Sequence, residues 1–207
     1  MTPPEVTFET TEQGMAFTFV NGVRGTLNII DAHALIHHAQ DLPDGAKYLE
    51  TGSYLGCSAL LIALHSNATV WAHDVWVNDW SQLEGGPPPQ VDDYFFQFYS
   101  GVKKNNLIHR IIPIRGDSSW TIGIHDAESI DLAFVDGDHS YDGCSRDLYA
   151  VLPKMKKDGV ILIHDCTQDS EPLKAVMDFA LAHNKELQML PMSNGMARIA
   201  MASNTAV

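Results

Sequence analysis

Residues 130–166, IDLAFVDGDHSYDGCSRDLYAVLPKMKKDGVILIHDC, constrain the fold more than any other stretch of the chain. They contain two short, nearly continuous apolar runs, Ile130–Val135 and Gly159–Ile163, with a helical pattern between them. Such runs are typical of parallel strands that are covered on both faces. A right-handed crossover places both carboxyl ends at one rim of the sheet, where ligands of open α/β sheets bind. The sequence therefore predicts a site at this rim, formed by Asp136, Asp138, His139, His164 and Asp165.

Composition limits the class of protein. With 207 residues, 45% of them hydrophobic, the chain can bury one sizeable core, so we expect a single domain. The formal net charge of -13 disfavours nucleic acid as a partner, because a phosphate backbone binds basic surfaces. Three widely spaced cysteines without a C-x-x-C pair favour a reducing compartment, and no stretch reaches the roughly 18 apolar residues of a membrane span. We therefore expect a cytoplasmic protein without a membrane partner.

Two segments are expected to lie beside the central sheet. Residues 1–25 alternate apolar and polar side chains around Glu12-Gln13-Gly14, which favours a hairpin or arm that could also be a homo-oligomer contact. Residues 75–92 contain two glycines followed by three prolines, which excludes a helix or central strand there. We expect this segment to be a substrate-cap loop above the rim. The aromatic candidates for the cap are Trp76, Trp80 and, from the helix that follows, Tyr94.

A strand, a glycine turn and a helix are predicted between residues 47 and 64, with the pattern E-x-G-x-x-x-G-x-S from Glu50 to Ser58. Gly52 allows a tight turn and close approach of the backbone to a ligand. The middle glycine of the dinucleotide fingerprint is missing, so a nicotinamide cofactor is disfavoured. Asp74 follows the next predicted strand, 68–73, where a carboxylate can hold the hydroxyls of a ribose. Together these features predict nucleoside binding.

Two further patterns complete the expected sheet. Asp117 and Ser118 follow a predicted strand at 110–115, where they could bind an adenine ring or cap the helix that follows. Residues 186–190 and 196–201 are predicted to form a terminal hairpin, which adds an antiparallel strand to an otherwise parallel sheet.

In this order, the glycine pattern, Asp74, Gly116-Asp117-Ser118 and the V-D-G-D-H-S-Y segment resemble class I S-adenosylmethionine-dependent methyltransferases. More narrowly, the chain is similar to the group of macrocin-type sugar O-methyltransferases and cephalosporin-hydroxylase-like proteins. The resemblance covers about residues 47–165. It implies an α/β fold with a Rossmann-like, doubly wound, mostly parallel seven-stranded sheet, a C-terminal antiparallel hairpin, and helices on both faces.

The resemblance also implies site residues. S-adenosylmethionine would contact Glu50, Gly52, Ser53, Gly56, Ser58, Asp74, Asp117, Ser118, Asp136 and Tyr141. Metal-dependent members hold a magnesium ion at positions that are Asp136, His164 and Asp165 here. His164 stands where the family usually has an acid, which favours manganese, iron or zinc over magnesium, or a site without metal.

Methyl transfer from a sulfonium is an in-line displacement, so the acceptor must be positioned and its proton must be removed. His139 is the first candidate for the base, because its ordinary pKa is about 6.5. Asp138 is the second, and it could instead cap the helix that follows. The expected activity is methyl transfer to a hydroxyl of a small molecule such as a sugar or a phenol. The alternatives are a hydroxylase-like protein and a non-catalytic nucleoside-binding protein on the same scaffold.

Overall fold

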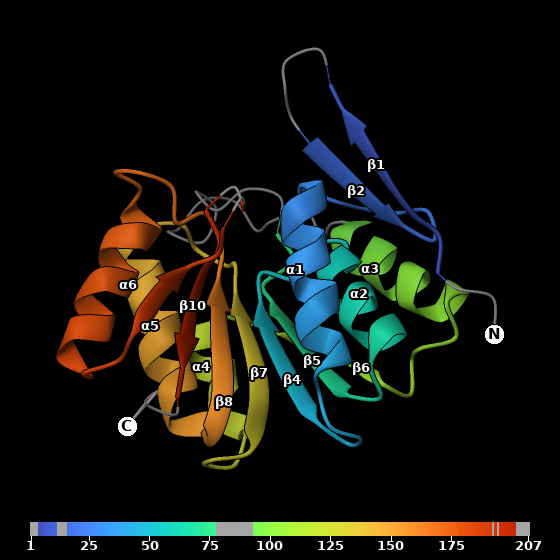
Figure 1. Ribbon diagram of the computed structural model, residues 1–207. Coiled ribbons are helices and arrows are strands. Elements are labelled where there is room, and N and C mark those ends of the chain that lie inside the picture. The colour runs from blue at the N-terminus through green and yellow to red at the C-terminus, as the bar shows by residue number, and fades with distance from the viewer. Residues whose placement is uncertain (1–3, 12–15, 78–92, 192, 194, 202–207) are drawn as a thin grey trace, which may run out of the picture.

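A seven-stranded sheet forms the centre of the computed structural model, which describes residues 4–11, 16–77, 93–191, 193 and 195–201. The strand order is β6-β5-β4-β7-β8-β10-β9 (Figure 1). The first five of these strands are parallel, whereas β10 runs antiparallel to both of its neighbours. The mostly parallel sheet and its terminal hairpin confirm the predicted fold class. The strands are β4 (Lys47–Thr51), β5 (Thr69–Asp74), β6 (Ile111–Arg115), β7 (Ile130–Val135), β8 (Met155–Ile163), β9 (Leu187–Met189) and β10 (Ala197–Ala200).

Helices cover both faces of this sheet (Figure 1). One face carries α1 (Ile29–Gln40), α2 (Cys57–His65) and α3 (Asp93–Lys104). The other face carries α4 (Ser118–Thr121), α5 (Tyr141–Val151) and α6 (Glu171–Ala182), with short 3-10 turns η2 (Ile122–Ile124) and η3 (Leu152–Lys154). Strand β7 lies between these layers. Its Leu132 and Phe134 belong to the first core, and Ala133 and Val135 belong to the second. This two-sided burial explains the uninterrupted apolar run in the sequence.

The first 25 residues include a small antiparallel sheet of order β1-β2-β3. Its strands are β1 (Val6–Thr10), β2 (Ala16–Val20) and β3 (Val23–Gly25), so the predicted hairpin is present and has a third strand. Gly25 packs so closely on α2 that an added Cβ would lie 2.4 Å from Cys57 Cβ. An oligomer contact through this arm stays a prediction. Residues 78–92, with Trp80 and most of the predicted cap loop, lie outside the described residues.

The helices described here are short. The longest have 12 residues, and none within the described ranges is long and apolar enough to cross a membrane. Cys57, Cys144 and Cys166 are free and buried.

Candidate functional site

The carboxyl ends of four parallel strands meet at one rim of the sheet. Strand pairing places Thr51 beside both His73 and Val135, and Val135 beside Ile163, so the residues that follow these strands are neighbours. Gly52, the first residue after β4, has a φ of +79°. A Cβ at Gly52 would lie 1.9 Å from the backbone oxygen of Asp136, so only glycine fits this contact.

Two hollows open at this rim and share Gly52, Asp74 and Gly137. We call the first the narrow cleft, because its volume is only about 40 Å³. We call the second the wide cavity, which has a volume of about 550 Å³. Besides the shared residues, the narrow cleft is lined by His73, Val75, Gly116, Asp117, Ser118, Ser119, Asp138, Gly143, Arg146 and Asp147. The wide cavity is lined by Thr26, Tyr54, Trp76, Val77, Tyr94, Asp136, His139, His164 and Asp165.

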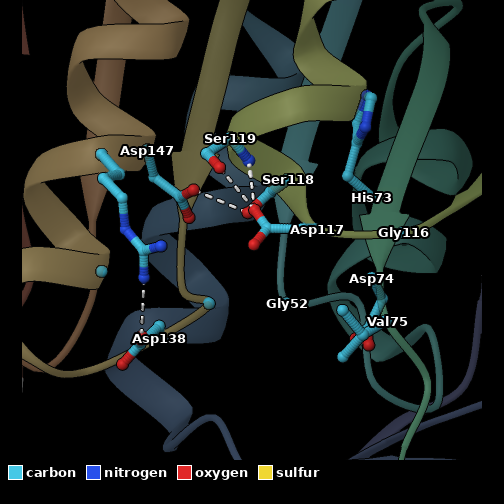
Figure 2. Close-up of a pocket in the computed structure, with 13 residues that line it drawn as sticks. Gly52, His73, Asp74, Val75, Gly116, Asp117, Ser118, Ser119, Asp138 and Asp147 are labelled. Atoms are coloured by element: carbon cyan, nitrogen blue, oxygen red, sulfur yellow. Dashed lines mark hydrogen bonds and ion pairs between the residues drawn. The ribbon is translucent and has the colours of Figure 1, made fainter. Parts of the chain in front are cut away.

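Polar side chains of α4 and α5 meet in the narrow cleft (Figure 2). The Asp117 carboxylate caps α4 by accepting a hydrogen bond from the Ser119 backbone N–H at 2.9 Å. The Ser118 hydroxyl donates to Asp147 Oδ1 at 2.6 Å. The predicted pair Asp117 and Ser118 therefore lines the cleft, and Asp117 also has the capping role that the sequence left open.

An exposed ion pair lies at the edge of the narrow cleft. Arg146 Nη2 is 3.5 Å from Asp138 Oδ2, and the two side chains are 58% and 38% exposed. Asp138 Oδ1 accepts from the Ser140 N–H, while Ser140 itself caps α5. Exposed ion pairs contribute about 1 kcal/mol or less, so this contact can part at little cost.

Asp74 connects the two hollows. Its carboxylate accepts hydrogen bonds from the backbone N–H groups of Tyr54 at 2.7 Å and Trp76 at 2.6 Å. Burial raises the pKa of Asp74, and these two hydrogen bonds oppose that shift. Asp74 therefore fixes two loops, one after β4 and one after β5, as well as facing both hollows.

Glu50 is buried beneath the glycine turn. Its Oε2 accepts from the Tyr48 hydroxyl at 2.9 Å, and the nearby hydroxyls of Ser53 and Ser58 also stabilise its charged form. Burial raises the pKa of Glu50 to about 7. Gly56 begins α2 with a φ of +89°, and Ser58 is buried in the first turn of that helix. These predicted cofactor residues lie in and under the turn, and they line neither hollow.

Two acids and two histidines form a closed ring at the end of the wide cavity, which we call the Asp–His ring. His164 Nδ1 lies 3.2 Å from Asp136 Oδ1 and 3.4 Å from Asp165 Oδ1. His139 closes the ring, with Nε2 at 3.4 Å from Asp136 Oδ1 and Nδ1 at 3.2 Å from Asp165 Oδ2. The structure thus brings together the acids and histidines that follow β7 and β8, except Asp138.

Charges within the Asp–His ring shift its protonation equilibria. Burial alone would lower the pKa of His164, but Asp136, Asp165 and Asp31 raise it well above its ordinary value. Burial would likewise raise the pKa of Asp136, but His164 and His139 lower it. The hydrogen bond to Asp136 raises the pKa of His139. These contacts therefore favour charged carboxylates beside a charged His164.

A third acid, Asp31, supports the ring from α1. It is fully buried, and its Oδ2 lies 3.1 Å from His164 Nε2. In the sequence Asp31 looks like an ordinary acid in the first turn of a helix, so its pairing with a residue 133 positions away gave no signal. Asp147 was also not predicted to line the narrow cleft, although the pair Asp147-Leu148 follows shortly after the D-G-D-H-S-Y segment.

Three aromatic predictions have different outcomes. Trp76 is 1% exposed, its indole N–H donates to the Tyr54 carbonyl at 2.8 Å, and it is therefore a fixed wall of the wide cavity. Tyr94 also lines this cavity and packs edge-on against Tyr54. Tyr141 was expected at the cofactor, but its hydroxyl donates to Asp178 of α6 at 2.9 Å and it lines neither hollow.

The Asp–His ring also fits a metal ion. Asp136, His139 and Asp165 each offer one donor atom, and these three atoms lie within 4.8 Å of one another. His164 Nδ1 faces the same two carboxylates. Oxygen and imidazole donors in one cluster suit a divalent ion.

The sheet order and the acids at its carboxyl rim define an α/β protein whose candidate site lies at the carboxyl ends of its parallel strands. Comparison with known proteins makes this more specific. A family model described as a methyltransferase domain matches residues 49–166, which is more than half of the chain. The chain belongs to this methyltransferase family. No curated protein sequence is significantly similar to it.

Solved structures share the fold at low sequence identity. The O-methyltransferase NovP superposes with a TM-score of 0.69 at 13% identity, over 86% of this chain and 82% of that chain. Cofactor-bound Rv0187 from MTB gives 0.65 at 13% identity, over 86% and 82%. The SAH-bound methyltransferase PaMTH1 from Podospora anserina gives 0.61 at 20% identity, over 83% and 77%.

Proposed function

We propose that this protein transfers the methyl group of S-adenosylmethionine to a hydroxyl of a small, uncharged molecule. The observation that carries the proposal is the junction of the two hollows at Gly52, Asp74 and Gly137. A nucleoside in the narrow cleft and an acceptor in the wide cavity would meet there, with the Asp–His ring beside the acceptor. Holding the two reactants in line supplies most of the rate enhancement of such a displacement.

We assign the parts of the cofactor to residues along the rim, from the adenine to the methionine end. Asp117 and Ser118 would contact the adenine, with Asp147 fixing the direction of the Ser118 hydroxyl. Asp74 would accept from the ribose hydroxyls. Glu50 and Ser53 are buried in and under the glycine turn, so we assign them to the support of this turn beside the methionine end of the cofactor.

The walls of the wide cavity favour a neutral acceptor. Tyr54, Trp76 and Tyr94 contribute aromatic rings, on which both sugars and phenols can pack. Among the described residues that line the cavity there is no lysine or arginine, and its ionisable groups are Asp74, Asp136 and Asp165 and the two histidines of the Asp–His ring. A neutral sugar or phenol needs no cationic partner there, which is why we propose an uncharged acceptor.

We infer that His139, not Asp138, removes the acceptor proton. The two residues are adjacent in sequence but line different hollows, His139 the wide cavity and Asp138 the narrow cleft. As the acceptor oxygen bonds to the methyl carbon and the carbon–sulfur bond breaks, the hydroxyl proton would pass to a neutral His139 imidazole. Asp136 and Asp165 would stabilise the resulting imidazolium, and S-adenosylhomocysteine would leave.

A divalent ion at the Asp–His ring, held by Asp136 and Asp165, would lower the pKa of the acceptor hydroxyl and fix its orientation. We therefore propose that a divalent ion assists the methyl transfer, with residues of the Asp–His ring as its donors.

Calorimetry with S-adenosylmethionine, followed by mass spectrometry of a panel of sugars and phenols, tests the proposal. We expect cofactor binding at sub-millimolar concentration and a gain of one methyl group on a hydroxylated acceptor. Absence of cofactor binding would refute it. Binding without turnover on any acceptor, with and without metal, would instead favour a non-catalytic nucleoside-binding protein.

A further inference from the structure

We propose that Asp31 is a positioning residue that holds His164 as the nitrogen donor of a mixed carboxylate–imidazole metal site, and that His139 stays outside the donor set. This inference rests on the proposed function, because it concerns the ring beside the acceptor. It assigns separate tasks to two histidines that contact the same two acids.

The His164 ring is held from two sides. Its Nε2 faces Asp31 Oδ2 at 3.1 Å, and its edge packs against Phe134 with ring centroids 5.9 Å apart. Asp31 is itself held in place, since Asn28, the residue that caps α1, donates its side-chain amide to Asp31 Oδ2. Asp31 is 0% exposed and the His164 side chain is 9% exposed, so water does not compete for this contact. The orientation of the imidazole is therefore set by the fold.

This orientation aims Nδ1 at the centre of the Asp–His ring. With Nε2–H donating to Asp31, a bound ion would take the place of the proton on Nδ1, between Asp136 Oδ1 and Asp165 Oδ1. A carboxylate behind a histidine is the usual support for a metal-bound imidazole, because it fixes the tautomer and raises the basicity of the other nitrogen. Asp31 occupies that supporting position.

His139 has a different environment. Its side chain is 54% exposed, and both of its nitrogens face the same two acids as His164. Unlike His164, it contacts no third acid among the described residues. His139 can therefore turn toward an acceptor in the wide cavity, whereas His164 cannot.

The donor set predicts which ions bind. Two carboxylates and one imidazole suit manganese, cobalt or zinc, and they suit magnesium and calcium less well because those ions prefer oxygen alone. Replacing His164 with aspartate would give a ring of oxygen donors and should move the preference toward magnesium.

Titration with Mn²⁺ and Co²⁺ alone tests the proposal, by calorimetry for affinity and by the visible spectrum of bound Co²⁺ for nitrogen ligation. We expect binding to the wild-type protein, and a loss of about 10- to 100-fold in affinity for Asp31→Asn, the effect typical of removing a supporting residue. His139→Ala tests the donor assignment, because its nitrogens face the same two acids and the proposal places it outside the donor set. The control is His37→Ala, which removes an exposed histidine paired with Asp41 outside the ring and should stay within about threefold of wild type. His164→Asp should lose the Co²⁺ spectrum of an imidazole ligand while gaining affinity for Mg²⁺.

Either of two results would overturn the inference: no ion binding to the wild type, or loss of binding in His139→Ala with Asp31→Asn unaffected. Affinity for S-adenosylmethionine, measured on the same samples, reports the proposed function separately, and its absence would refute that function instead. If Asp31→Asn does not fold, Asn28→Ala removes the amide that holds Asp31 and should weaken metal binding in the same direction.

Discussion

Replacing His164 with alanine should destabilise the protein strongly. The substitution leaves Asp31, which is fully buried, and the largely buried Asp136 without their shared cationic partner. Removing one member of a buried ion pair typically costs about 3–5 kcal/mol of unfolding free energy. In a chain of this length each kcal/mol corresponds to roughly 2–4 °C in Tm, so we expect a fall of about 6–20 °C.

The effect should depend on pH with a defined sign. The pKa of His164 is raised in the folded protein, so its contribution is fully present below the unfolded pKa of about 6.5 and declines as pH rises above it. The pKa of Asp136 is lowered, so its contribution is lost as pH falls below about 4. The difference between His164→Ala and wild type should therefore be largest between about pH 5 and 6.5 and smaller at pH 8.5.

Urea unfolding of both proteins across this pH range measures the difference directly. His139→Ala provides the control, because it removes a half-exposed partner of the same acids and should cost about 1 kcal/mol or less. A cost for His164→Ala no larger than that of the control, or a difference that grows toward pH 8.5, would refute the idea that His164 is the buried cation of this site.

Four further predictions concern the cofactor and the chemistry. Asp74→Asn should weaken S-adenosylmethionine binding by about 1.5–3 kcal/mol, or roughly 10- to 150-fold in Kd, in calorimetry; unchanged affinity would remove the ribose assignment. His139→Ala should bind the cofactor normally and turn over at least about 10²-fold more slowly on the true acceptor, and an active variant would move the base to Asp138 or solvent. Asp147→Ala frees the Ser118 hydroxyl and should cost about 0.5–1.5 kcal/mol of cofactor affinity, while no change would exclude a role for Asp147 in holding Ser118. Because burial raises the pKa of Glu50 to about 7, its contribution to stability falls as pH rises from about 4.5 to 7; Glu50→Gln should flatten this part of the urea stability profile, and an unaltered slope would contradict that pKa.

The central sheet could be predicted because its strands are buried on both faces. The run from Ile130 to Val135 is apolar at nearly every position, and two packed layers are the simplest way to bury such a run. The terminal hairpin and the helix after Gly56 followed from turn residues in the same way. The sequence pattern was sufficient to predict these elements, because each one is determined by residues that are close together in the chain.

Side-chain direction could not be predicted in this way. Asp138 and His139 are adjacent, and only the path of the chain between β7 and α5 decides that they line different hollows. Tyr141 points to α6 because Asp178, 37 residues later in the chain, accepts its hydroxyl hydrogen. Asp31 joins the site through a contact between the first helix and the end of β8. Each of these depends on distant contacts that leave no periodic signal in the sequence.

The contact between Gly52 and the Asp136 carbonyl has a kinetic consequence. There is no space between the two backbone segments, so a movement of the turn after β4 must displace the segment after β7 as well. A shift of this turn when a nucleoside binds would therefore realign the acids that face the wide cavity. We expect an ordered reaction in which the cofactor binds before the acceptor, with S-adenosylhomocysteine competitive against the cofactor and noncompetitive against the acceptor.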